Sequence, residues 1–317
     1  MKKVIYIALF ICTFASKAQE LKLSPYTQYL TENPFTISPT FAGMDEEYNR
    51  LRISGVMQWI GIKNAPSTQN LSYDVRFDEK SAGGIILYND KNGNTKQIGG
   101  QLSYAHHLVL DDASEQYLTL GLSYKFNHLK ISTENFTNGN DDPVNDPAVG
   151  AARTTTNHNF EFGALYRYEK FFFSLNASNI IGKKEKDFNS IEPLRLRNYY
   201  VYTGYTFVSN SQEYEYEPSI YLKYFEADKR SVTDLNFKAR KYTEDGYIWA
   251  GINSRFINDQ SFEPLSIAPL LGIKKKDYYF GYAFQWNINE ASDLNSSGTH
   301  MITLGFDIEK NRGGTSW

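Results

Sequence analysis

Histidines are the chain's main candidates for acid–base chemistry or metal binding, and there are five: His106, His107, His128, His158 and His300. His106 and His107 are neighbours in a strand-like stretch, so their side chains point to opposite faces and cannot hold one metal ion. The others belong to separate stretches that the sequence does not bring together. We therefore predict no catalytic, cofactor-binding or metal-binding residues and expect no enzyme. A hydrolase that assembles Ser, His and Asp from distant strands is the remaining alternative.

Acidic residues cluster in NGNDDPVNDPA (138–148), where Asp141, Asp142, Asn145 and Asp146 offer the hard oxygen ligands that calcium prefers. Their spacing matches no EF-hand, and two prolines stiffen the run. We interpret it as a solvated acidic loop and leave calcium binding as the alternative. The basic runs KKEKD (183–187) and KKK (274–276) are interpreted as solvated turns, with contact to lipid headgroups as the alternative.

The first twenty residues, MKKVIYIALFICTFASKAQE, combine a basic start, an apolar run and small residues at a cleavage site. They predict a secretory signal peptide over residues 1–18, with a buried N-terminal strand as the alternative. Cys12 is the only cysteine and lies inside that run, so the mature chain has no thiol for disulfides or zinc sites. The formal charge is −3, and removing the three lysines of the signal leaves about −6. No long basic run is present, so nucleic acid is not an expected partner.

Strict alternation of apolar and polar residues dominates the rest of the chain. In QYLTLGLSYKFN, every second residue from Leu118 to Phe126 is apolar, and the residues between them are small or polar. HMITLGFDIE and DYYFGYAFQWNI repeat the pattern. A period of two is the signature of a strand with one apolar face, and long helical periodicity is missing. The sequence therefore predicts an all-β fold.

We expect about fourteen strands, most of them roughly 10 to 14 residues long, which suits a tilted crossing of a bilayer. They lie near residues 49–60, 67–77, 81–90, 95–111, 116–132, 157–169, 170–180, 197–209, 214–227, 231–243, 245–258, 261–276, 277–288 and 298–309.

The connections between these strands alternate in length. After odd-numbered strands they include NDKNGNT (89–95) and the stretches 133–156, 182–193 and 289–298. After even-numbered strands they are tight: FDEKS, DDASE, YEK, SNSQE, YTEDG and KKKD. Short periplasmic turns and longer external loops are typical of outer-membrane barrels. We therefore predict a transmembrane antiparallel up-and-down β-barrel over residues 49–309, preceded by a short N-terminal periplasmic segment (19–48) and followed by a tail (310–317).

Aromatic residues make up 15% of the chain, although its mean hydropathy is only −0.50. Several tyrosines and tryptophans lie near the predicted strand ends, among them Tyr199, Trp249, Tyr278 and Trp286. Such rings suit the boundary between hydrocarbon and water, because one end is apolar and the other polar. We expect these four residues in the outer aromatic girdle.

The first third of the chain carries a specific motif that runs YTQYLTENPFTISPTFAG, then a strand, then MQWIGIKNAPSTQNLSYD and LYNDKNGNT. It resembles the PorP/SprF family of the Bacteroidetes type IX secretion system, which has a "QY...NP...I.P..AG" segment, a "QW.G..GAP.TQ..S" hairpin and an "ND..G.T" loop. The positions that we select as family-motif residues, structural or in contact with a partner, are Gln28, Tyr29, Asn33, Pro34, Pro39, Gly43, Gln58, Trp59, Gly61, Pro66, Gln69, Asn89, Asp90 and Gly93. Asn64 stands where the family has glycine, and asparagine tolerates left-handed geometry.

The resemblance implies a non-enzymatic outer-membrane protein that binds, displays or anchors secreted cargo. The implied partners are a surface adhesin or other cargo with a type IX C-terminal sorting domain, other secretion components and outer-membrane lipid, and a role in gliding motility is possible within the family. We take the connections 133–156, 182–193 and 289–298 as candidate cargo contacts. A diffusion channel or porin is the alternative, because a barrel of fourteen strands could leave a lumen lined by inward residues such as Lys125, Gln285 and Asp307.

The stretch NPFTISPTFAG (33–43) precedes the first strand, and its two prolines prevent it from joining a ladder. We expect it to enter or cap the periplasmic mouth of the barrel as a small plug, with Phe35, Ile37 and Phe41 packed against lumen side chains. An ordinary ordered leader to the first strand is the alternative.

Overall fold

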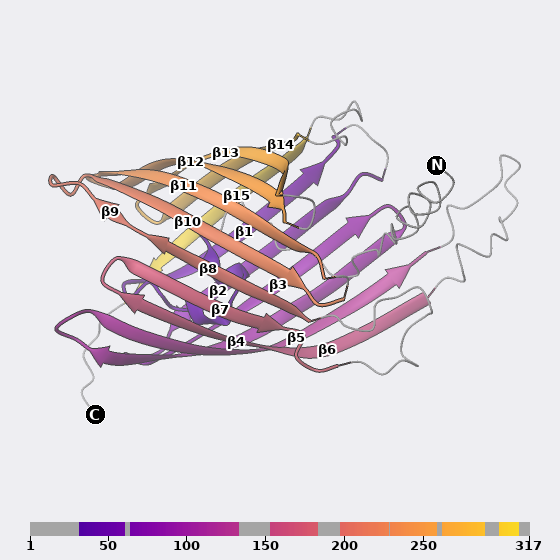
Figure 1. Ribbon diagram of the computed structural model, residues 1–317, viewed down its shortest axis with the longest axis horizontal. Helices are drawn as coiled ribbons and strands as arrows, with labels where there is room; N and C mark the ends of the chain where they lie inside the picture. Colours follow the sequence, from indigo (N-terminus) through magenta and orange to yellow (C-terminus); the bar gives the residue numbers. More distant parts are fainter. Residues whose placement is uncertain are drawn as a thin grey trace, which may run out of the picture.

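The computed structural model describes residues 32–60, 64–132, 153–182, 197–227, 229–258, 262–288 and 298–310. Figure 1 shows one wide, tilted cylinder of strands with a short N-terminal segment inside it. No helix in these residues is long and apolar enough to cross a membrane. The predicted signal peptide and the acidic run 138–148 lie outside the described residues.

Two short 3-10 helices precede the strands, η3 (Pro34–Thr36) and η4 (Pro39–Phe41). The strands are β1 (Tyr48–Gln58), β2 (Ser67–Arg76), β3 (Ser81–Asn92), β4 (Thr95–Asp111), β5 (Gln116–Ile131), β6 (Arg153–Tyr168), β7 (Phe171–Ser178), β8 (Asn198–Tyr205), β9 (Phe207–Val208), β10 (Tyr214–Phe225), β11 (Ser231–Thr243), β12 (Gly246–Ile257), β13 (Glu263–Lys275), β14 (Tyr278–Asn287) and β15 (Thr299–Glu309). Because β9 only continues β8 along β10, the wall consists of fourteen strands, as predicted.

The sheet is antiparallel and closed. Each long strand pairs with the long strands before and after it in the chain, so that β8 pairs with β10 and β10 pairs with β11. The first strand, β1, pairs with the last, β15, from Tyr48↔Glu309 to Gln58↔Thr299. In hydrocarbon every backbone donor and acceptor needs a partner within the protein, and a closed sheet provides one. The predicted up-and-down barrel is confirmed.

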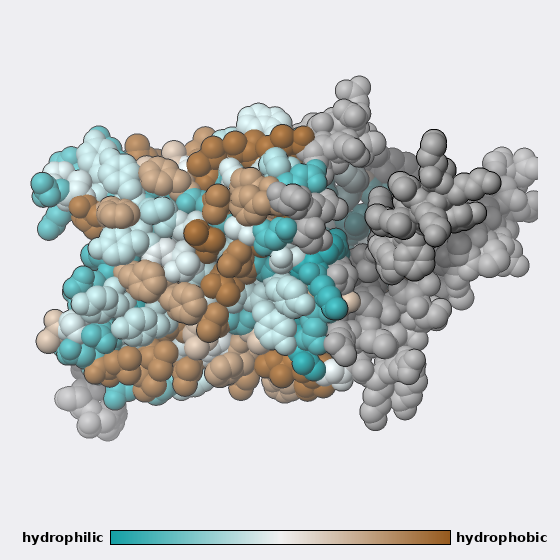
Figure 2. All heavy atoms as spheres, in the orientation of Figure 1, coloured by the Kyte–Doolittle hydropathy of each residue, from teal (hydrophilic) through white to brown (hydrophobic). Residues whose placement is uncertain are grey.

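Alternation separates an outer apolar face from an inner polar face. On β5, Leu120, Leu122 and Tyr124 are exposed, whereas the alternating residues Thr119, Gly121 and Ser123 are buried. On the face drawn in Figure 2, apolar side chains are spread over the wall between more hydrophilic ends of the barrel. Their exposure fits a surface that contacts lipid tails, because a soluble monomer rarely exposes so large an apolar area.

The six tight turns are present as predicted, between β2 and β3, β4 and β5, β6 and β7, β9 and β10, β11 and β12, and β13 and β14. One connection that was predicted to be long, NDKNGNT (89–95), is in fact short. β3 and β4 pair as far as Asn92↔Thr95, so NDKNGNT is mostly strand and turns at Gly93, whose φ of 58° permits a tight reversal. The strand predicted to start at residue 157 begins earlier, at Arg153.

Trp249 is a further correction. The prediction placed it in the outer girdle, but its side chain faces inward, is 3% exposed and packs in a lumenal cluster with Val56, Leu270 and Met301. Tyr199, Tyr278 and Trp286 do lie on the outer face and are exposed. The barrel thus has apolar clusters inside as well as a belt outside, and period-two alternation alone does not reveal the inner ones.

Candidate functional site

Residues 32–43, here called the lumenal segment, lie inside the barrel. Pro34 and Pro39 each occupy the first turn of a 3-10 helix, where the missing N–H costs nothing. Ser38 caps the second helix by accepting a hydrogen bond from the Thr40 N–H. Phe35, Ile37 and Phe41 are 0%, 3% and 3% exposed, so a segment that makes no ladder is nevertheless fully packed.

Aromatic rings from the opposite wall cover the segment. Phe41 lies 6.0 Å from the ring of Tyr202, and Tyr202 contacts Phe172 at 4.8 Å between centroids. Tyr221 stands beside Tyr202 and is fully buried. Burial of these rings is the main apolar contribution to docking of the segment.

Three inward glycines make room for the segment. A Cβ on Gly121 would lie 2.7 Å from the Thr40 nitrogen, one on Gly163 would lie 2.8 Å from the Ser38 hydroxyl, and one on Gly84 would lie 2.5 Å from the Phe35 ring. These distances are shorter than van der Waals contact. The wall of β3, β5 and β6 is therefore shaped to this segment.

Side chains of the wall also satisfy the backbone of the segment. Asn176 donates to the Ile37 carbonyl at 2.9 Å, and His107 Nε2 donates to the Ala42 carbonyl at 3.2 Å. His106, the next residue, faces outward and stacks with Tyr104, as alternation predicts. His107 therefore has a structural role in holding the segment, because its other ring nitrogen bonds to Thr119.

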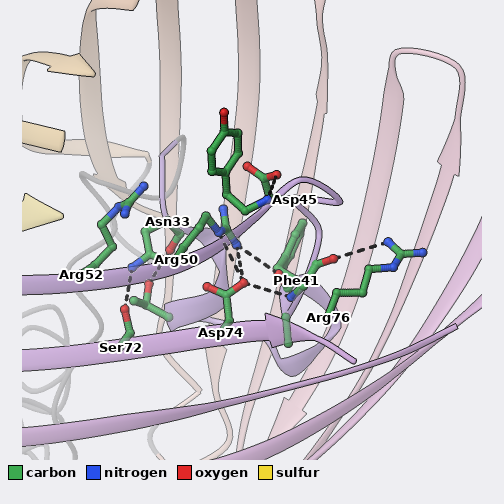
Figure 3. Close-up of polar contacts among 12 residues, drawn as sticks. Asn33, Phe41, Asp45, Arg50, Arg52, Ser72, Asp74 and Arg76 are labelled. Carbon is green, nitrogen blue, oxygen red and sulfur yellow. Dashed lines mark hydrogen bonds and ion pairs between the residues drawn. The ribbon is translucent and has the colours of Figure 1, made fainter. Parts of the chain in front are cut away.

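The segment leaves the lumen through an ionic anchor, drawn in Figure 3. Asp74 accepts hydrogen bonds from the Gly43 N–H and from the Arg50 guanidinium, each at 2.9 Å. Arg50 also reaches the Phe41 carbonyl, and Arg76 reaches the Gly43 carbonyl. Gly43 has a φ of 60°, and a Cβ at this position would lie 2.5 Å from the Cβ of Ala82, so the position favours glycine.

At its other end the segment is held by Glu32. Its carboxylate lies 2.7 Å from Arg240, 3.1 Å from Lys238 and 3.0 Å from the Tyr247 hydroxyl. Burial raises the pKa of this carboxyl, but the charges of Arg240 and Lys238 outweigh burial and lower the pKa to about 2. Glu32 is therefore ionised, and it crosslinks the segment to β11 and β12.

A cavity of about 120 Å³ remains between the segment and the wall. Thr36 and Ile37 line one side, and Arg52, Lys125 and Tyr88 line the other. Its charged residues are paired across neighbouring strands: Lys125 with Glu161, and Arg52 with Asp307, which also binds Lys274. This arrangement holds the wall and the segment together.

A second group of motif residues lies at the far end of β1, β2 and β3. The Gln58 N–H bonds to the Pro66 carbonyl, and the Trp59 N–H bonds to the Gly298 carbonyl. Asn89 donates to Gln69, and the Gly93 N–H bonds to the Asn64 carbonyl at 3.3 Å. Asn64 has a φ of 61°, the left-handed geometry expected where the family has glycine.

The predicted motif residues therefore form two groups and not one site. Asn33, Pro34, Pro39 and Gly43 belong to the lumenal segment, and Asn33 bonds to Ser72 on β2 at 3.0 Å. The residues of the second group are Gln58, Trp59, Pro66, Gln69, Asn89, Asp90 and Gly93, with Asp90 accepting from Thr68. Gln28, Tyr29 and Gly61 lie outside the described residues.

Sequence reasoning missed several residues of the lumenal site, chiefly Glu32, Asp74, Gly121, Gly163 and Asn176. The small or polar face of each strand was visible, but alternation does not say which of its residues contact the segment. The glycines on the inner faces of β3, β5 and β6 were the one signal that another part of the backbone comes close to the wall.

Comparisons with known proteins give one family and one fold. A family model described as "Type IX secretion system membrane protein PorP/SprF" matches residues 18–306. Among solved structures, the CymD monoaromatic hydrocarbon channel has a TM-score of 0.55 at 11% identity, with 92% of this chain and 95% of that chain covered. Omp33 from Acinetobacter baumannii has a TM-score of 0.45 at 9% identity, with 83% and 99% covered. No curated protein matches the chain by sequence.

Proposed function

The chain belongs to the PorP/SprF family of type IX secretion system membrane proteins, and from this premise we propose that it binds secreted cargo at the outer membrane and displays or anchors it. The cargo is a cell-surface adhesin or another protein with a type IX C-terminal sorting domain. A role in gliding motility follows where that adhesin is a motility adhesin. The action is recognition, not a reaction.

The observation that carries this proposal is the filled lumen. The lumenal segment is seated on inward glycines, bonded through Asn176 and His107, and fixed by Asp74 and Glu32 at its two ends. A barrel blocked in this way offers rigid ends for partners, in place of an open path. We infer that the segment is a plug at the periplasmic mouth, contributed by the N-terminal part of the chain before β1.

The two ends of the barrel suit different partners. The second motif group and the long connections 133–156, 182–193 and 289–298 are proposed to contact cargo, although most of those connections lie outside the described residues. The six tight turns are proposed to face periplasmic secretion components. Outer-membrane lipid contacts the apolar belt between the two ends.

The test is a deletion of residues 24–43 in the natural host, with surface display of the cargo measured by antibody labelling of intact cells. We expect the barrel to reach the outer membrane and the surface signal of the cargo to fall strongly. Total cargo and barrel abundance are measured in the same cells as controls. Unchanged barrel stability together with unchanged display would show that the segment is only a leader.

A diffusion channel is the second candidate, and the cavity beside the segment favours it. The CymD channel shares the fold, although at 11% identity that likeness concerns architecture alone. A channel needs a continuous path past Thr36 and Ile37, or a segment that leaves the lumen. Conductance measurements in planar bilayers distinguish the two candidates.

A further inference from the structure

Strand β6 extends well past its neighbour β7. It pairs with β5 along its whole length, from Arg153↔Ile131 to Tyr168↔Gln116. Its pairing with β7 covers only Glu161↔Ser178 to Tyr168↔Phe171. Figure 1 shows β5 and β6 continuing beyond the end of β7 on the side of the long connections. The upper part of β6, residues 153–160, is therefore an edge strand within an otherwise closed barrel.

The side chain of Asn159 ends the β6–β7 ladder. Its Oδ1 accepts hydrogen bonds from the Phe160 and Ile181 N–H groups, each at 2.9 Å, and its Nδ2 donates to the Ile181 carbonyl at 3.0 Å. Asn159 is 1% exposed, so this stop is built into the wall. Above it, β7 gives β6 no further partner.

The free groups of the edge can be assigned from the ladder. The Phe160 carbonyl accepts from the Ile180 N–H and so points toward β7. In an antiparallel strand the backbone groups of alternate residues point to the same side, which places those of Thr154, Thr156 and His158 on the open side. All three residues are exposed, and within the described ranges no backbone partner occupies that side.

This edge stands above the apolar belt. Outward residues of β5 change from Leu122, Tyr124 and Phe126 to His128 and Lys130 along the strand. Tyr124 hydrogen-bonds to His158 and packs edge-on against Phe160, with 5.7 Å between the ring centroids. Such an aromatic group suits the membrane boundary. Residues 154–157 therefore face water on the side of the long connections.

An exposed edge of this kind is a template for another strand. Natural proteins block such edges with proline, lysine or bulges, yet TTTNHN (154–159) contains none of the blocking residues and is rich in threonine, which favours strands. Cations stand near the opening. Lys130 on β5 pairs with Thr154, and Arg197, which also binds Glu226, directly precedes the strand that pairs with Ser178 at the end of β7. The occupant that complements this surface is extended and acidic.

We propose that the free edge of β6, residues 153–160, binds an extended acidic segment of a partner protein by β-strand addition. Backbone hydrogen bonds to Thr154, Thr156 and His158 supply the pairing, and the flanking cations select negative charge. The proposal rests on the proposed function only in that the partner is cargo on the side of the long connections.

The test uses the purified full barrel in detergent micelles and fluorescent peptides about nine residues long, the length that spans residues 153–161 when extended. The probe alternates valine with glutamate. We expect saturable binding that weakens about tenfold or more when alternate backbone nitrogens are methylated, because methylation removes the pairing donors. Replacing glutamate by lysine should also weaken binding.

Two variants separate backbone from side chain. Thr156→Pro removes the donor on the open side, where proline is tolerated, and should weaken binding about tenfold. Thr156→Ala loses the same side chain and should bind as the natural chain does.

Equal binding of the methylated peptide, or of Thr156→Pro, would overturn the proposal. So would binding that appears only after residues 183–196 are replaced by a short glycine–serine linker, because the chain's own connection would then be the occupant. Cargo display on cells is measured separately from peptide binding. A failure of the proposed function can therefore be told apart from a failure of strand addition.

Discussion

At the residue scale, Glu32 shows how a single carboxylate can fix a segment that forms no ladder. Arg240 and Lys238 are also paired with Glu215 and Glu217 on β10. Glu32 therefore completes a buried network, and removing it leaves two cations with one anion each. Removing one member of a buried ion pair is strongly destabilising, because the charge that remains is buried without its full compensation.

We expect Glu32→Gln to loosen the segment by about 3 kcal/mol at neutral pH. The measurement is hydrogen exchange of the amides of residues 33–43, corrected for intrinsic rates, and exchange should be roughly a hundredfold faster in the variant. Exchange at the wild-type rate would show that Glu32 does not hold the segment.

The same carboxylate predicts the pH dependence of docking. The pKa of Glu32 is lowered from 4.5 to about 2, so its contribution is complete above 4.5 and is lost as the pH falls towards 2. Protection of residues 33–43 should be constant from about pH 8 to about pH 5 and decline below that. Glu32→Gln serves as the control, since it should lack the part of this decline that comes from Glu32.

Nothing in the sequence connects Glu32 with Arg240, which lies 208 positions later. The pairing depends on barrel closure and on the path of the segment, and neither is a local property. Asn64 is the opposite case: its left-handed backbone was anticipated because the turn requirement is local.

At the element scale, the inward glycines explain why β3, β5 and β6 accept the segment. Gly121→Ala should shift or expel it, because the new Cβ would meet backbone atoms at 2.7 and 2.9 Å, and backbone cannot move aside cheaply. We expect a loss of about 1–3 kcal/mol in docking, read by the same exchange measurement. Gly55→Ala on β1 is the matched control, since no atom lies within 4 Å of its Cβ. If the two variants show the same exchange rates, the close approach at Gly121 does not contribute to docking of the segment.

The outer face of the strands predicts a second pair of variants. Leu122 is 49% exposed in the middle of the belt, so Leu122→Arg should destabilise the inserted barrel by about 2–4 kcal/mol. Val109 lies near the tight turn of β4 and is also exposed, and Val109→Arg should cost only about 0–1 kcal/mol. Reversible unfolding in lipid vesicles measures both. Equal costs would mean that the belt is not centred on Leu122.

The strands themselves were largely predictable, because alternation and turn residues are local signals. The predicted strand ends were wrong where strand pairing continues beyond the residues that show alternation. β6 begins at Arg153 because β5 supplies a partner for it, and β3 continues to Asn92 through residues that resemble a loop. Trp249 was misplaced because an inward ring needs an apolar cluster inside the lumen, and that cluster is assembled from distant strands.

At the scale of the whole molecule, the question is whether the barrel conducts. The wall is closed by β1–β15 pairing, and the lumenal segment lies inside it. Ion pairs between neighbouring strands, such as Arg52–Asp307 and Lys125–Glu161, line the inner face. The rings of Phe35 and Phe41 are buried between the segment and the wall, so they fill interior space that a solute would need. We therefore expect little current through the natural protein in planar bilayers.

Deletion of residues 24–43 should give a large and steady increase in conductance, because the inner space vacated by the segment belongs to a barrel of fourteen strands, wide enough to leave a lumen. Gly55→Ala is the control for substitution without displacement and should conduct as little as the natural protein. A large open current through the natural protein would favour the channel candidate over the display proposal. If the deletion variant inserts and also stays closed, then the paired wall charges seal the barrel without the segment. The role of the segment would in that case be to shape the periplasmic end for a partner.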